Sequence, residues 1–82
     1  MIYFRQTVLR QIRSASNEKE VESVIDQSIQ RLKSRNVNGH IIQRFILAMD
    51  TTLIQAKLDA ASDQAEQNMD VAIGMFRKLQ RP

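Results

Sequence analysis

The stretch LDAASDQAEQ, residues 58–67, decides between two folds for this chain of 82 residues. It contains no proline and no glycine, and a helix over 39–80 would pass through it with one apolar stripe in continuous phase. Such a helix would give three helices in all, the last of them long. We keep this arrangement as the alternative prediction.

A repeated string within this stretch favours a turn instead. ASDQAE (61–66) has the same form as ASNEKE (15–20). In each string an Asn or Asp, here Asn17 or Asp63, can cap a helix while a Glu three residues later reaches back toward the cap. We therefore predict a turn near 60–62 and a new helix after it.

Apolar residues recur at helical spacing on both sides of this turn. The spacing predicts helices over about 2–14 and 18–34, a third from 39 to the turn, and a fourth from the turn to about 80. Only two glycines and the terminal Pro82 oppose helix formation. The sequence thus predicts an all-α fold, a single domain over 1–82 that forms an up-down bundle of four helices with a short first helix.

The stretch NVNGHIIQRF, residues 36–45, predicts the corner between the second and third helices. Asn36 suits a left-handed position that ends one helix, and Asn38 suits the cap of the next. The unpaired N–H groups of the first turn, flanked by Arg35 and Arg44, would form an anion-binding corner. The simpler interpretation is a tight turn with a surface histidine.

Charge is predicted to divide between the two ends of the bundle. The chain has a net charge of +3 and a pI near 9.8. One end gathers eight basic residues and no acidic one, namely Arg5, Arg31, Lys33, Arg35, Arg44, Arg77, Lys78 and Arg81. The other end gathers the basic Arg10, Arg13, Lys19 and Lys57 with the acidic Glu18, Glu20, Glu22, Asp26, Asp59, Asp63, Glu66 and Asp70. Macrodipole complementarity explains part of this pattern, but not Arg44 in the early part of the third helix or Asp59 at its end.

The basic end predicts one of two candidate functions, the binding of nucleic acid through its phosphate backbone. The candidate residues for this anion or nucleic-acid site are Arg31, Lys33, Arg35, Gly39, His40, Arg44, Arg77 and Lys78.

A second apolar stripe on the third helix predicts the other candidate function. Leu47, Ile54 and Leu58 lie roughly 120–140° around the helix from its main stripe, taking about 100° per residue. One stripe is enough for a helix in a bundle. Three explanations fit the second: burial within the monomer, a homodimer interface, or a surface for another helical protein.

Catalytic and cofactor motifs are absent from the sequence. Two isolated glycines cannot form a phosphate-binding loop, a lone histidine offers no zinc pair, and there is no cysteine. We predict no enzyme activity, cofactor, metal or small-molecule substrate. With neither a signal peptide nor an apolar run of roughly 20 residues, we expect a cytoplasmic protein outside the membrane. The preferred prediction is a non-enzymatic protein–protein interaction module that self-associates through the third helix.

Overall fold

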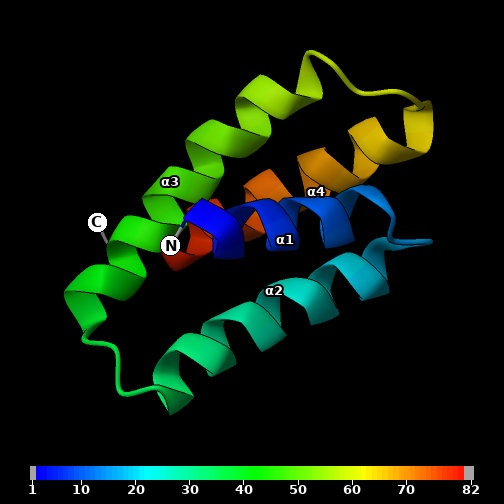
Figure 1. The fold of residues 1–82 in the computed structure, drawn as a ribbon. Coiled ribbons are helices and arrows are strands. Elements are labelled where there is room, and N and C mark those ends of the chain that lie inside the picture. The colour runs from blue at the N-terminus through cyan, green and yellow to red at the C-terminus, as the bar shows by residue number, and fades with distance from the viewer. Residues whose placement is uncertain (1, 81–82) are drawn as a thin grey trace.

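The computed structural model describes residues 2–80 and forms a bundle of four helices (Figure 1). These are α1 (Ile2–Arg13), α2 (Glu18–Ser34), α3 (Gly39–Lys57) and α4 (Asp63–Leu79). Successive helices run in alternating directions, and α1 is the shortest. The all-α up-down bundle is confirmed, and the alternative with one helix over 39–80 is wrong.

The turn between α3 and α4 is made by local hydrogen bonds. The N–H groups of Leu58, Asp59 and Ala60 each donate to a carbonyl three residues back, which tightens the last turn of α3 and ends it. The hydroxyl of Ser62 then accepts a hydrogen bond of 3.1 Å from the N–H of Ala65 and caps α4.

The cap of α4 is therefore Ser62, and the prediction of Asp63 was wrong by one residue. Asp63 is the first helical residue, where its carboxylate faces the positive end of the helix dipole. Serine and aspartate cap about equally well, so adjacent residues of these two types do not reveal which one is the cap.

The matching string before α2 behaves as predicted. The side chain of Asn17 accepts a hydrogen bond of 2.9 Å from the N–H of Glu20. The carboxylate of Glu20 reaches back and accepts one of 2.7 Å from the N–H of Ser16. The two bonds resemble a capping box, except that Glu20 takes the N–H one residue before the cap rather than that of Asn17 itself.

The corner between α2 and α3 is also as predicted. Asn36 has a φ of 58°, in the left-handed region. Its N–H donates to the carbonyl of Lys33, and the N–H of Val37 donates to the carbonyl of Leu32, which is the Schellman pattern. The side chain of Asn38 accepts a hydrogen bond of 3.0 Å from the N–H of Ile41 and caps α3.

Helices α1 and α4 form the centre of the bundle. α4 packs against all three other helices, and α1 contacts α2, α3 and α4. α2 and α3 lie on either side of this central pair and make little contact with each other beyond their connection (Figure 1). The bundle measures 36 × 23 × 21 Å, so its two ends are well separated.

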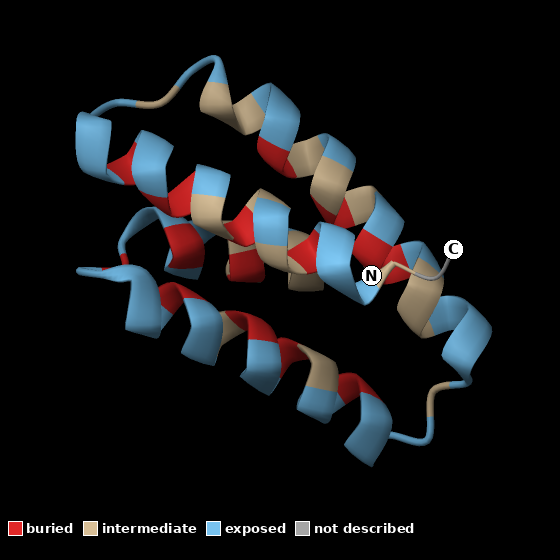
Figure 2. Ribbon diagram, turned by 180° about the vertical axis from the view of Figure 1, so that it is seen from behind, coloured by how far each residue is buried: buried red, intermediate tan, exposed pale blue. Residues whose placement is uncertain are grey.

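The core consists of the inward faces of all four helices (Figure 2). The largest fully buried side chains include Phe45, Met49, Leu53, Met69 and Phe76. Phe45 stacks at a tilt on Phe4 at 5.3 Å between ring centroids and meets Phe76 edge-on at 6.1 Å. This aromatic row joins α1, α3 and α4 near the basic end of the bundle.

One buried polar side chain ties α4 to the end of α1. Asn68 is 2% exposed, and its amide donates to the carbonyls of Ile12 and Ala15 at 3.0 and 2.8 Å. Its oxygen accepts a hydrogen bond of 3.0 Å from Gln64. Asn68 thus gives the carbonyl of Ala15 a buried donor and adds a second donor to the carbonyl of Ile12, which also accepts from the N–H of Ala15.

Candidate functional site

The second apolar stripe of α3 lies on the outer surface of the bundle. Leu47, Ile54 and Leu58 are 54%, 43% and 85% exposed. They point away from the side of α3 that packs on α4, where Met49 and Leu53 are fully buried. The explanation by burial within the monomer is therefore wrong, because neither α1 nor α4 reaches this side of α3.

The face around this stripe carries almost no charge. Arg44 is the only exposed residue of α3 with a permanent charge, whereas α2 exposes seven charged residues. Thr51 and Gln55 are exposed on the same side of α3, between Leu47 and Leu58. The outer face of α3, defined here as Leu47, Thr51, Ile54, Gln55 and Leu58, is thus a neutral and largely apolar strip. Charged residues are depleted in the same way at the centre of protein interfaces.

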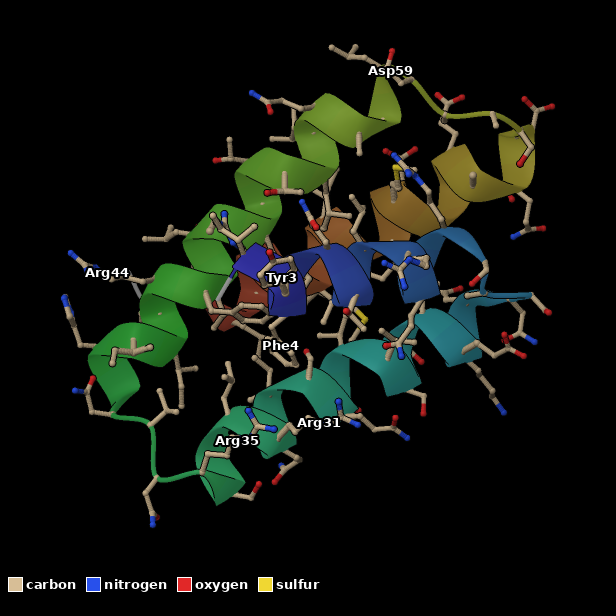
Figure 3. The ribbon with its side chains drawn as sticks, viewed as in Figure 1. Tyr3, Phe4, Arg31, Arg35, Arg44 and Asp59 are labelled. Atoms are coloured by element: carbon tan, nitrogen blue, oxygen red, sulfur yellow. The ribbon has the colours of Figure 1, made fainter. Side chains whose placement is uncertain are left out.

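Two opposite charges flank the outer face of α3. Arg44 lies one turn before Leu47, and Asp59 follows Leu58 directly, at the far end of the helix (Figure 3). The two are about 22 Å apart at 1.5 Å per residue. Both are exposed, and within residues 2–80 neither makes an ion pair. Two charged residues of α3 that could compensate them are already paired with α4. Lys57 Nζ lies 2.6 Å from Asp70 Oδ1, and Asp50 Oδ1 lies 3.3 Å from Arg77 Nε.

The ion pair between Lys57 and Asp70 joins the end of α3 to α4. The hydrogen bond that Lys57 donates to Asp70, together with the negative charge of Asp70, raises the pKa of Lys57 above the ordinary value of 10.5. Both side chains are substantially exposed, at 37% and 53%, so solvent screens their attraction. The pair holds the two helices in register beside the turn.

At the basic end, Arg31 and Arg35 border a groove beside α1. Phe4, Leu32 and Val37 complete the lining of this groove, whose volume is about 180 Å³. Phe4 lies between the first turn of α1 and the C-terminal half of α2, next to both arginines (Figure 3). The groove combines an apolar floor with two exposed positive charges.

A second groove lies on the other side of α1. Arg5, Ile41, Arg44, Phe45 and Ala48 line it, and its volume is about 380 Å³. The Nε of Arg5 is buried and has no hydrogen-bond partner among residues 2–80.

Tyr3 is the exposed aromatic side chain of the same α1 turn. It is 85% exposed on the outer side of the turn that supplies Phe4 to one groove and Arg5 to the other (Figure 3). The two grooves on either side of this turn are lined by four arginines, Arg31 and Arg35 in one and Arg5 and Arg44 in the other.

The other predicted basic residues do not join this cluster. Arg77 is held by Asp50 on the side of α3 that faces α4. Lys33 and Lys78 are exposed on α2 and α4 without lining either groove. Arg81 lies outside the described residues. The basic side chains predicted to form one site are thus spread over several surfaces, and only some of them lie together.

The predicted anion corner at the start of α3 is capped by the chain itself. Gly39 and His40 are exposed there, but Asn38 takes the N–H of Ile41. The N–H of Ile41 is therefore taken, whereas no hydrogen bond is formed by the N–H groups of Gly39 and His40 among residues 2–80. The corner is a tight turn whose possible anion ligands are these two N–H groups together with Arg35 and Arg44.

Sequence reasoning missed two residues that matter to these surfaces. Thr51 lies at the middle of the outer face of α3, and a helical projection centred on Leu47 and Leu58 identifies it. Tyr3 is the most exposed aromatic residue of the first turn, and its position between two basic grooves depends on how α2 and α3 flank α1. No signal in the sequence reports that arrangement.

The described part of the chain holds no group of three His, Cys, Asp or Glu side chains placed to bind a metal ion. None of its helices combines the length and apolar character needed to cross a membrane. No model of a known protein family, no curated protein and no solved structure matches the chain.

Proposed function

We propose that the protein is a protein–protein interaction module that self-associates through the outer face of α3. The observation that carries this proposal is the exposure of Leu47, Ile54 and Leu58 on a face with no charge between its ends. Scattered exposed apolar residues are normal, but three aligned on one helix face are typical of an interaction site.

The size of this face sets the expected affinity. α3 has 19 residues and is about 28 Å long. A standard interface buries about 800 Å² per partner, close to one seventh of the 5593 Å² of accessible surface here. One helix face with its flanks supplies the lower part of that range, so we expect a dissociation constant of about 1–100 µM.

Sedimentation velocity between about 5 and 500 µM tests the proposal. We expect a monomer–dimer equilibrium for the natural sequence and a monomer for Ile54→Glu/Leu58→Glu. Because both side chains are exposed, the double variant should keep its helical circular dichroism. Ile2→Glu is the control for one such substitution, since it adds a single carboxylate at an isoleucine of α1 that is 59% exposed. If the double variant remained dimeric, the dimer interface would not lie on the outer face of α3.

A second candidate function is the binding of nucleic acid at the basic end. It is supported by Tyr3, whose ring is 85% exposed beside two grooves that carry Arg31, Arg35, Arg5 and Arg44. Arginines neutralise phosphates, and an exposed aromatic ring stacks on an unpaired base of any sequence. Single-stranded nucleic acid therefore fits this surface better than a duplex.

Fluorescence anisotropy of labelled single-stranded and duplex oligonucleotides tests this candidate. We expect single strands to bind at about 20 mM salt and to dissociate by about 200 mM. Arg31→Gln/Arg35→Gln should weaken binding and make it less sensitive to salt. Arg10→Gln/Arg13→Gln removes the same charge at the opposite end and should bind like the natural sequence. Equal losses in both variants, or no binding at low salt, would reject the candidate.

A further inference from the structure

We propose that two copies of the chain pair through α3 in antiparallel orientation, with a two-fold axis that passes between Thr51 and Ile54. The pairing rests on the self-association proposed above and adds its direction and register. The occupant of the outer face of α3 is then a second copy of this chain.

The spacing of the exposed side chains is symmetric about this axis. Leu47 lies four residues before Thr51, and Leu58 lies four residues after Ile54. In an antiparallel pair, one axis therefore places Leu47 against the partner's Leu58 and Thr51 against the partner's Ile54. The same contacts repeat on the other side, as an isologous interface requires.

The charges that flank the face become complementary in this register. Arg44 lies three residues outside Leu47, and Asp59 lies one residue outside Leu58. Arg44 of one copy then falls within one helical turn of the partner's Asp59, twice per dimer, and a long arginine side chain spans that offset. A parallel pair would instead place Arg44 beside Arg44 and Asp59 beside Asp59.

The same register explains two charges that the helix dipole does not favour. A base near the start of α3 and an acid at its end are both unfavourable toward the macrodipole of their own helix. Within residues 2–80 they have no compensating ion pair, and Lys57 and Asp50 are engaged by Asp70 and Arg77 instead. A partner in antiparallel orientation supplies the compensation.

The ends of the whole bundle add to this complementarity. Antiparallel pairing brings the basic end of one copy beside the end of the other that carries eight acidic and four basic residues. Across 36 Å of bundle length, this separation of charge steers two copies toward the antiparallel encounter. A parallel encounter would bring like ends together.

Charge reversal tests the pairing. Arg44→Glu or Asp59→Arg alone converts both ion pairs of the dimer into repulsive contacts, and we expect each to raise the dissociation constant about ten-fold. The double variant Arg44→Glu/Asp59→Arg restores opposite charges and should return to within about three-fold of the natural sequence. Gln55→Glu serves as a control for adding charge to the same face without an opposing partner.

Cross-linking tests the direction independently of charge. The chain has no cysteine, so Leu47→Cys and Leu58→Cys each carry a single thiol. Antiparallel pairing separates two copies of either position by about 16 Å along the axis. A short bismaleimide should therefore link a mixture of the two variants into heterodimers but link neither variant alone. Circular dichroism and sedimentation of each variant establish that it folds and still associates.

The outcomes of these experiments distinguish failure of the antiparallel pairing from failure of self-association itself. A dimer whose single variants cross-link to themselves is parallel, which overturns the antiparallel pairing and leaves self-association through α3 intact. A dimer that is indifferent to both charge reversals overturns the register. A natural sequence that stays monomeric up to about 500 µM overturns both proposals, and the face then serves another helical protein.

Discussion

The amide of Asn68 on α4 donates a hydrogen bond of 2.8 Å to the carbonyl of Ala15, which lies just after α1. This contact joins two parts of the chain that are 53 residues apart and both buried. It favours one axial position of α4 against α1, because a shift of α4 by one turn would break both hydrogen bonds from Asn68 and leave the buried carbonyl of Ala15 without this donor.

We predict that Asn68→Ala destabilises the fold by about 2–3 kcal/mol. The substitution leaves the carbonyl of Ala15 without its donor, removes one of the two donors to the carbonyl of Ile12, and opens a cavity beside Ile12. Urea denaturation followed by circular dichroism measures the loss. Gln64→Ala, which removes only the exposed end of this network, should cost about 0.5 kcal/mol or less. Equal effects of the two variants would show that Asn68 acts only by filling space.

Gly74→Ala should stabilise the fold by about 0.5–1 kcal/mol. Gly74 lies inside α4 on an exposed face, and a Cβ there would meet nothing within 4 Å. We expect the melting temperature to rise by about 3–6 °C. Gly39→Ala, at the first position of α3, should have a smaller effect, since the penalty for glycine belongs to helix interiors. A decrease on Gly74→Ala would mean that this face of α4 is covered in solution.

Ser62→Ala should destabilise the fold by about 1 kcal/mol through loss of the α4 cap. Asp63→Ala should cost about 0.5 kcal/mol, because that carboxylate interacts only with the helix dipole. Thermal or urea unfolding of the two variants, compared side by side, checks the order. The reverse order would reinstate Asp63 as the cap.

The ion pair of Lys57 with Asp70 should make a small contribution to stability that depends on pH. Because the folded state raises the pKa of Lys57, this contribution is complete below 10.5 and is lost as the pH rises through the higher folded value. The stability difference between the natural sequence and Lys57→Met should therefore shrink between about pH 10 and pH 12. In the Asp70→Asn background, which removes the main partner of Lys57, the difference should depend less on pH.

The parts of this fold that the sequence predicted are those set by short-range hydrogen bonds. Asn17, Asn36 and Asn38 act within three residues of their own position, so their residue types report the caps directly. The turn after Leu58 was predicted on the same ground. Its cap was placed one residue late because Ser62 and Asp63 are chemically equivalent in that role.

The parts that were not predicted depend on which helices become neighbours. A helical projection locates Leu47, Ile54 and Leu58 on one side of α3, but it does not reveal whether another helix covers that side. The outcome follows from α3 lying at the edge of the bundle, against α4 and α1 alone. The arrangement of helices also decides which basic residues line the two grooves and why Arg77 lines neither. It likewise decides that Asn68 meets the end of α1.

The central place of α4 also governs when the chain acquires its structure during synthesis. It is the last of the four helices to leave the ribosome, and it supplies Ala65, Met69, Ala72 and Phe76 to the core. Until it emerges, α1, α2 and α3 lack the one helix that packs against all of them. The nascent chain therefore exposes these faces together with the outer strip of α3, in a form that chaperones and proteases recognise. A messenger truncated before Asp63 should yield a polypeptide that is degraded rather than folded.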